Sequence, residues 1–216
     1  MREAYQTKLE GLAGQLADMC DAVALAMRQA TDALLNVDLA LAEAVISADL
    51  RIDELRNQAE EDCFALLALQ APVATDLRVV VAAIHATSDL ERMGDLALHV
   101  AQATRRRHPS EVLPSEVKPY FAEMGKVGVE LAHRAAEVLR TPSVDRATEL
   151  ETADDAMDDL HRHMFTVLMG REWSHGVASA VDVTLLARFY ERYGDHAVAV
   201  ARRMIYVVTG QMPNGL

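Results

Sequence analysis

The chain has 216 residues, of which 51% are hydrophobic, 25% are charged and only 5% are aromatic. This balance is typical of a folded globular protein and argues against a disordered chain. The net charge of −12 disfavours nucleic-acid binding, because a phosphate backbone would be repelled. The same charge is compatible with binding cations or with docking on a basic protein surface.

The sequence shows no sign of export or of a membrane anchor. Its first residues carry charges throughout, and no segment approaches the roughly 20 apolar residues that a membrane-spanning helix needs. The two cysteines, Cys20 and Cys63, form no metal-binding or redox motif and lie among apolar residues. We expect two small buried side chains in a reducing compartment, and hence a cytoplasmic protein.

Helix-breaking residues divide the chain into segments in which apolar residues recur every three to four positions, without the alternation of a strand. Thr75 or Asp76 would be the N-cap of the third helix. In chain order, helices are predicted at about 3–36, 38–68, 75–107, 115–142, 143–170 and 176–209.

The predicted helices form two matching sets of three, which indicates an all-α fold of two tandem three-helix bundles. A linker near residues 108–116 would separate a domain at 1–108 from a second at 109–216. Helices this long are unusual in globular proteins, and long antiparallel bundles account for them. The arginines at 105–107 complement the dipole at the C-terminal end of a helix. We therefore interpret them first as a helix cap and only second as a binding patch.

One phrase occurs twice: ERMGDLALHVA at 91–101 and ERYGDHAVAVA at 191–201 share seven of eleven positions. Each copy contains a glycine and puts its two carboxylates, four residues apart, on one helix face. Such a carboxylate pair weakens a helix by about 0.2–0.5 kcal/mol, and a glycine costs about 1 kcal/mol relative to alanine. The face is otherwise largely apolar, and its one threonine, Thr87 or Thr184, can bond back to its own helix. Both the like-charge pair and the mid-helix glycine therefore recur at the same positions of the two copies.

The preceding helices carry acidic pairs of their own. Asp53 and Glu91 lie 19 residues on either side of Pro72, so an antiparallel hairpin that turns there sets them at equal height. In the second half, the corresponding pairs share a midpoint of 174.5, inside the turn REWSHG. Each hairpin therefore brings four carboxylates together. The predicted clusters are Asp49, Asp53, Glu91 and Asp95 in the first half, and Asp154, Asp158, Glu191 and Asp195 in the second.

Metal coordination accounts for these clusters better than two plainer alternatives. One alternative is a solvated acidic face. The other is internal salt bridging by Arg51 or Arg92, although Arg92 projects about 100° away from Glu91. Oxygen ligands suit hard cations, or iron in carboxylate-bridged form, so iron, zinc, magnesium and manganese all stay open. Each glycine would spare room beside the ions or permit close helix packing.

Three histidines lie near the clusters in the sequence. His99 follows Asp95 by four residues and could approach the first cluster, but it has an alanine at the corresponding place in the second half, so we interpret it as a packed or surface residue. His161 and His163 are expected on the surface. No nucleophile elbow, phosphate-binding glycine loop or catalytic triad is found, which favours a protein that is not an enzyme.

Three phrases resemble the PhoU family over essentially the whole chain: LQAPVATDLR at 69–78, DLERMGDLA at 89–97 and YERYGDHA at 190–197. The doubled E-x-x-x-D phrase is specific only in combination with P-x-A-x-D-L-R. One departure is that Asp76 and Arg78 have no clear match in the second half. A role for that phrase is therefore expected in the first half alone.

The resemblance implies a cytoplasmic negative regulator of phosphate uptake and of the response to phosphate starvation. Its expected partners are the ATPase subunit of a phosphate ABC transporter and a membrane sensor histidine kinase. Nucleic acid is not a partner, and the membrane is reached only through these proteins. The resemblance also implies a homodimer, and multinuclear metal sites that the repeated phrases build with the preceding acidic pairs, which match less closely in the second half.

The rival class is a ferritin-like carboxylate enzyme or iron store, which usually adds Glu-x-x-His from two helices. Glycine occupies that position in both clusters, and the spacing occurs only at Glu130/His133 and Glu172/His175. A third possibility is a helical adaptor that binds no metal.

Overall fold

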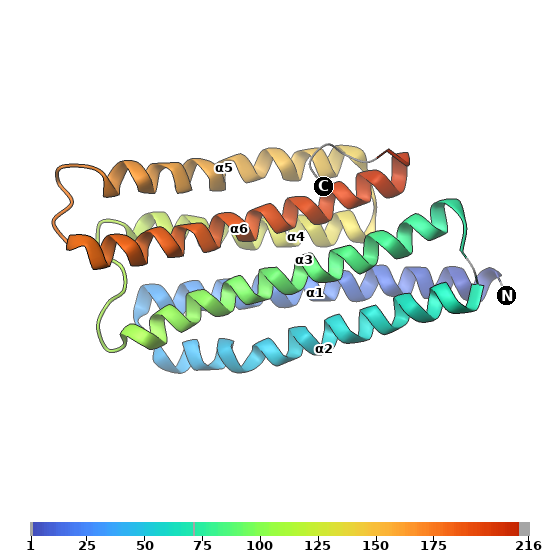
Figure 1. Ribbon diagram of the computed structural model, residues 1–216, viewed down its shortest axis with the longest axis horizontal. Coiled ribbons are helices and arrows are strands. Elements are labelled where there is room, and N and C mark those ends of the chain that lie inside the picture. Colours follow the sequence, from blue (N-terminus) through green and yellow to red (C-terminus); the bar gives the residue numbers. More distant parts are fainter. Residues whose placement is uncertain (1, 71, 212–216) are drawn as a thin grey trace.

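The computed structural model describes residues 2–70 and 72–211, and within them it contains helices and no strand. The helices run along the long axis of the molecule, with α1 to α3 grouped on one side and α4 to α6 on the other (Figure 1). The predicted all-α fold of six long helices is therefore confirmed. The helices are α1 (Arg2–Asn36), α2 (Leu39–Gln70), α3 (Ala74–Arg107), α4 (Lys118–Arg140), α5 (Val144–Leu168) and α6 (Gly176–Thr209).

The ends of α5 and α6 follow the predicted breakers. Ser143 is the N-cap of α5, and its side chain accepts a hydrogen bond from the backbone N–H of Arg146. α6 spans the predicted range and ends at Thr209, and Gly210 is its C-cap, whose φ of 72° lies in the left-handed region that favours glycine.

The starts of α3 and α4 differ from the prediction. α3 begins at Ala74, so neither expected residue caps it, and the N-cap position falls to Val73 without a side-chain bond. α4 is shorter at both ends than predicted. Pro119 occupies its first turn, where the missing N–H does no harm. At the other end, Pro142 disfavours helical backbone at Thr141, so α4 ends at Arg140.

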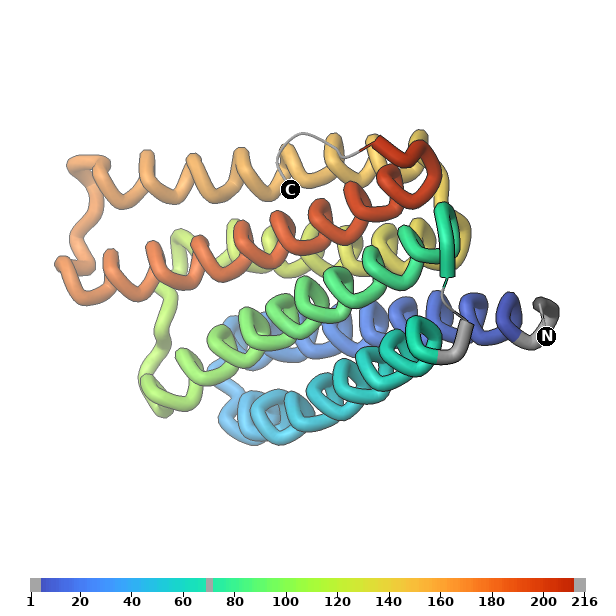
Figure 2. The backbone as a smooth tube through the Cα atoms, turned by 45° about the vertical axis from the view of Figure 1, so that its right-hand side comes forward, coloured from blue at the N-terminus to red at the C-terminus, as the bar shows by residue number. Residues whose placement is uncertain are grey.

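The two halves pack together along their length. α3 lies against α6, and α1 lies against α4 (Figure 2). The buried side chains of both halves form one hydrophobic cluster. Cys20 and Cys63 are buried free thiols within this cluster, as predicted. None of the described helices is long and apolar enough to cross a membrane. The division into domains at residue 108 stays a prediction.

Close packing between the halves depends on small side chains. A Cβ at Gly125 of α4 would lie 2.6 Å from the Thr31 side chain of α1, so only glycine permits this approach. The Thr31 hydroxyl is hydrogen-bonded to the Tyr190 hydroxyl of α6 at 2.8 Å. Three helices from both halves therefore meet at one buried point.

Polar contacts hold α3 against α6 along their whole length. Asp89 of α3 is the one charged side chain that is buried within the described part of the chain. His196 Nδ1 lies 3.1 Å from its Oδ1, and Arg203 Nε donates to its Oδ2 at 2.8 Å. Arg78, near the start of α3, donates to the Val207 carbonyl at the end of α6 at 3.4 Å. These bonds cross from one half to the other.

Arginines also pair at the far end of α3. Arg107 pairs with Asp182 of α6, and Arg105 lies 3.7 Å from Glu43 of α2. Both arginines lie in the last turn of α3, where positive charge is favourable. This arrangement agrees with a helix end rather than with a free basic patch.

Candidate metal centres

The first predicted cluster lies between α2 and α3. Burial raises the pKa of Asp49, and the carboxylates of Asp53, Asp95 and Glu91 raise it further. Burial also raises the pKa of Glu91, and the Asp95 carboxylate adds to this effect. All four predicted side chains therefore lie in one charge environment, as the spacing about Pro72 predicts.

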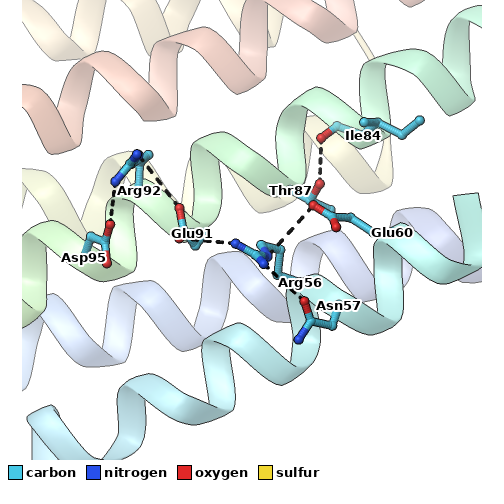
Figure 3. A network of polar contacts seen from close by, with 8 residues as sticks. All are labelled: Arg56, Asn57, Glu60, Ile84, Thr87, Glu91, Arg92 and Asp95. Carbon is cyan, nitrogen blue, oxygen red and sulfur yellow. Dashed lines mark hydrogen bonds and ion pairs between the residues drawn. The ribbon is translucent and has the colours of Figure 1, made fainter.

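Two arginines partly neutralise this first cluster (Figure 3). Arg56 Nη1 lies 3.4 Å from Glu91 Oε1, and Arg92 Nη1 lies 2.8 Å from Asp95 Oδ2. Both guanidinium groups oppose the rise in the pKa of Glu91 that burial causes. Internal salt bridging therefore occurs for Arg92, whereas Arg51 pairs with an exposed glutamate on its own helix.

The second cluster, between α5 and α6, is less well neutralised. Burial raises the pKa of Asp154 to about 7, and the carboxylates of Asp158, Asp195 and Glu191 raise it as well. Asp154 Oδ1 and Glu191 Oε2 are buried and have no hydrogen-bond partner among the described residues. Arg188 pairs with the other oxygen of Glu191. Four carboxylates with two unpaired buried oxygens form a site that a cation would stabilise.

The glycine of the repeated phrase makes room for the neighbouring helix. A Cβ at Gly194 would overlap Asp154 Oδ1, so an aspartate oxygen occupies the space that a side chain would fill. A Cβ at Gly94 would lie 3.0 Å from Ile52 Cδ1 and 3.7 Å from Asp49 Oδ1. Each glycine therefore permits close helix packing, and in the second half it also seats a carboxylate.

The apolar stripe beside each carboxylate pair also follows the prediction. Thr87 Oγ1 donates to the carbonyl of Ile84 at 2.6 Å, and Thr184 Oγ1 donates to the carbonyl of Ala180 at 2.8 Å. Both hydroxyls are bonded back to their own helix, so neither marks a wet face.

The prediction that His161 lies on the surface is wrong. Its side chain is only 14% exposed, and its Nδ1 lies 4.0 Å from Glu191 Oε1. Burial lowers the pKa of His161, and the nearby Arg188 guanidinium lowers it further, so the ring is neutral near pH 7. His99 and His163 are exposed, as expected, but His99 lies close enough to the first cluster to oppose the rise in the pKa of Asp49.

Arg56 and His161 occupy equivalent places in the two halves, and neither was among the predicted site residues. Each follows the second aspartate of the predicted acidic pair on its helix by three residues and therefore shares its face. Arg56 contacts Glu91, and His161 approaches Glu191. The same helical spacing that located the aspartates could have found both residues.

The donor set fits a metal ion by chemistry and by its unpaired atoms. The buried oxygens of Asp154 and Glu191 lack partners among the described residues, and the glycine seat holds one of them against α6. As the side chains lie, no three His, Cys, Asp or Glu residues in the described ranges are arranged to hold an ion. In the first cluster, Glu91 and Asp95 point to arginines instead. Coordination by the eight carboxylates stays a prediction.

The Glu-x-x-His pairs that a ferritin-like site would need lie elsewhere. Glu130 bonds to Arg134 on the surface, and His133 lies 3.3 Å from Asp21 of α1. His175 lies 2.8 Å from a glutamate that precedes α4. None of these contacts joins a carboxylate cluster.

The fold and the two sites define a class: a duplicated helical protein with one acidic cluster between two helices of each half. The PhoU domain family matches the chain twice, over residues 16–104 and 121–204. The chain belongs to the PhoU family, as its phrases predict. This finding favours the PhoU interpretation over a ferritin-like one.

Relatives match along their full length. Phosphate-specific transport system accessory protein PhoU homolog 2 of Mycobacterium tuberculosis is 58% identical over 99% of this chain and 100% of that protein. PhoU homolog 1 of Mycobacterium leprae is 56% identical over 99% and 96%. The crystal structure of PhoU from Pseudomonas aeruginosa has a TM-score of 0.83 and 25% identity over 96% and 100%. The regulatory protein PhoU from Streptococcus pneumoniae, with a TM-score of 0.88 and 23% identity over 97% and 99%, shares the fold.

Proposed function

We propose that this protein regulates phosphate transport by coupling a phosphate ABC transporter to a membrane sensor histidine kinase. It keeps phosphate-starvation genes off while phosphate is plentiful. The observation that carries the proposal is 58% identity, along the whole chain, to a protein named as an accessory of the phosphate-specific transport system. Both halves of the chain match the family, so the proposal applies to the whole chain and not to one half.

The output of the protein in this proposal is binding and not catalysis. Long helices offer extended surfaces, and a net charge of −12 complements basic cytoplasmic faces of membrane partners. Association with the transporter ATPase and the kinase should weaken as salt rises, because exposed charges are screened. The protein acts in the cytoplasm as a homodimer and reaches the membrane through its partners.

Metal binding at the two carboxylate clusters is part of the proposal. Asp49, Asp53, Glu91 and Asp95 would hold one site, and the four carboxylates of the second half the other. A bound cation would supply the positive charge that lets the carboxylates lie close together while ionised. The unpaired oxygens of Asp154 and Glu191 support this role. Iron, zinc, magnesium and manganese are the candidate ions.

The regulatory role is tested with a reporter of a phosphate-starvation gene in cells that lack the gene for this protein. Deletion should switch the reporter on in rich phosphate, and the wild-type gene should restore repression. Mycobacterium tuberculosis has two homologs of this kind, so any second copy is deleted as well. Normal repression in the full deletion would reject the regulatory role.

The metal requirement is tested in the same cells with the four acidic positions of the repeated phrase changed to amides: Glu91→Gln, Asp95→Asn, Glu191→Gln and Asp195→Asn. The matched control changes two exposed glutamates of α4, Glu123→Gln and Glu130→Gln. Repression restored by the control and lost in the cluster variant supports a metal-dependent regulator. Repression restored by both variants would mean that the metal has a structural role and is not needed for regulation.

The partners are tested by affinity capture from cells grown with and without phosphate. Recovery of a transporter ATPase and a sensor kinase is expected, and their loss at raised salt would agree with charge-driven association. Capture of neither protein under either condition would contradict the coupling role.

A further inference from the structure

The start of α6 exposes large apolar side chains to solvent, at the end of the molecule where α5 turns into α6 (Figure 1). Val177, Val181 and Leu185 are 81%, 50% and 48% exposed and follow one another at intervals of four residues. With Leu168 and Trp173 they line an open groove of about 520 Å³. A contiguous exposed apolar surface of this kind marks a place where another molecule docks.

The polar side chains of this groove are already satisfied within the chain. Trp173 Nε1 donates to the carbonyl of Gly176 at 3.1 Å, and Thr184 Oγ1 donates to the carbonyl of Ala180 at 2.8 Å. Trp173 and Thr184 are the two lining residues that have a polar group in the side chain. An apolar surface can therefore cover the groove without leaving either group buried and unpaired.

The groove is also locally neutral, although the chain as a whole is strongly acidic. From residue 176 to residue 187, α6 has one charged residue, Asp182, and it pairs with Arg107 of α3. A net charge of −12 on each chain opposes the approach of a second copy. At this groove, two copies can meet without setting like charges against each other. The groove therefore suits a second copy better than it suits a basic surface.

The sizes of the side chains follow a pattern that a two-fold dimer requires. Positions four apart form a ridge along a helix, and such a ridge packs into a groove of a facing helix. In a two-fold dimer, each contact between two residues occurs twice, once in either direction. Two antiparallel copies of α6 with their midpoint at 180.5 meet this condition with each large side chain opposite a smaller one. The opposed pairs are Val177 and Thr184, Val181 and Ala180, and Leu185 and Gly176.

The corresponding part of the first half lacks this pattern. The same antiparallel pairing of two copies of α3 would set Val81 opposite Val80 and Leu77 opposite Ile84, so that large side chains would meet large ones. Val80 is moreover buried in the core of its own chain and offers no groove to a partner. The comparison singles out the second half as the half that can pair with itself.

We propose that the groove on α6 is the interface of a homodimer, in which two copies of α6 pack antiparallel about a two-fold axis between residues 180 and 181. This inference rests on the homodimer of the proposed function and assigns a surface to it. Trp173 and Arg188 are equally far from this axis on opposite sides. Arg188 is half exposed, so the guanidinium of one copy can lie over the indole ring of the other at each end of the interface.

The first test changes Val181, which lies at the proposed axis. Val181→Asp and Val181→Lys should each raise the Kd of the dimer at least about 100-fold, because each sets two buried like charges against each other. An equimolar mixture of the two variants should form the dimer again, because an aspartate then faces a lysine. Sedimentation velocity measures the association, and circular dichroism checks the fold. Val81→Asp, at the corresponding exposed position of the first half, is the matched control and should stay dimeric.

A cross-link locates the contact directly. The native thiols of Cys20 and Cys63 are buried, so an introduced surface cysteine is the reactive one. Mild oxidation of Val181→Cys should give a disulfide-linked dimer, because the two copies of position 181 flank the axis. The same treatment of Val81→Cys should leave the chains separate.

Three results would overturn the inference in distinguishable ways. A dimer that survives both Val181→Asp and Val181→Lys would place the interface of the homodimer elsewhere. A wild-type protein that stays monomeric at every concentration would overturn the inference together with the homodimer of the proposed function. An intact Val181→Asp dimer that no longer captures the transporter ATPase or the sensor kinase from cells would assign the groove to a partner protein instead.

Discussion

The two carboxylate clusters share a backbone frame and differ in how their charge is balanced. In the first cluster, arginines 56 and 92 pair with Glu91 and Asp95. In the second, Glu191 has one paired oxygen, and Asp154 Oδ1 is buried without a partner among the described residues. The comparison teaches that duplication preserved the helix geometry while single side chains decided how much of the carboxylate charge each cluster neutralises.

The largest expected effect is that of metal on stability, and it should be unequal between the halves. An ion at about 100 times its Kd should raise the free energy of unfolding by about 2.7 kcal/mol per site. Glu91→Gln with Asp95→Asn, and Glu191→Gln with Asp195→Asn, should each lose about half the bound metal. The second pair should lose more of the stability gain, because no arginine occupies the place of Arg56 there.

The measurement is thermal unfolding with Mg²⁺, Mn²⁺, Zn²⁺ or Fe²⁺ added to chelator-treated protein, together with metal analysis. An equal loss of stability in the two double variants would break the comparison. No shift with any ion, and no metal in protein purified without chelator, would contradict metal binding itself. If one double variant empties both sites, the metals are not held in separate halves.

A single substitution sharpens the comparison in metal-free protein. Asp154→Asn removes a partly buried carboxylate with one unpaired oxygen, and we expect it to stabilise the fold by about 1 kcal/mol or more. Asp49→Asn should stabilise less, because Asp49 has the nearby His99 as a partial counter-charge. Urea unfolding in chelator measures both, and Asp159→Asn, at an exposed position of α5, is the control. Equal stabilisation by Asp154→Asn and Asp49→Asn would contradict the conclusion that the second cluster is the less well neutralised.

The pH dependence of metal-free stability should come mainly from the second cluster. The pKa of Asp154 is raised from 3.8 to about 7, so the folded state binds this proton more tightly than the unfolded chain. Its contribution is fully present below about pH 4 and is lost as pH rises through about 7. The slope is at most about 1.4 kcal/mol per pH unit for one proton.

The measurement is urea unfolding between pH 5 and 8 in chelator, within the window set by that pKa. Asp154→Asn should flatten the decline of stability with rising pH, and Asp49→Asn should flatten it less. His161, whose pKa is lowered, acts in the opposite direction, so the test is the difference between variants: an Asp154→Asn protein whose stability changes with pH as the wild type does would reject the assignment.

The smallest expected effect compares the two glycines. Alanine gains about 1 kcal/mol of helix propensity at either position. At Gly94 the gain is offset by a small shift of the flexible tip of Ile52, so stability should change little. At Gly194 the Asp154 carboxylate must move, which should cancel the gain and weaken metal binding. Thermal unfolding and calorimetry of the two alanine variants check this. Equal metal binding in both variants would contradict a role for the close packing of Asp154 against Gly194.

The heights of the carboxylates could be predicted because antiparallel helices convert residue count into distance. Pro72 fixed one turn, and equal spacing on either side of it set Asp53 opposite Glu91. The fold class followed from helical periodicity and breakers. The predicted start of α4 was wrong. The apolar periodicity continues on the N-terminal side of Pro119, whereas the helix itself begins just before this proline.

The missed residues depend on packing between helices. His161 shares a face with the predicted aspartates, but its burial depends on how α5 is rotated against α6. Asp89 has a phenylalanine at the corresponding place of the repeat, and both its partners come from the other half. No spacing within one half indicates which helix of the other half lies against it.

The Asp89 contact has a mechanical consequence. Asp195 and His196 are consecutive on α6 and point about 100° apart, so one faces the second cluster while the other bonds to Asp89. Asp89 lies two residues before Glu91 on α3. The contact between His196 and Asp89 therefore ties together the two helices that carry the repeated phrase, close to a carboxylate of each cluster. A rotation of α6 about its axis would move His196, and with it the Asp89 side chain, so the geometry of the two halves is mechanically linked.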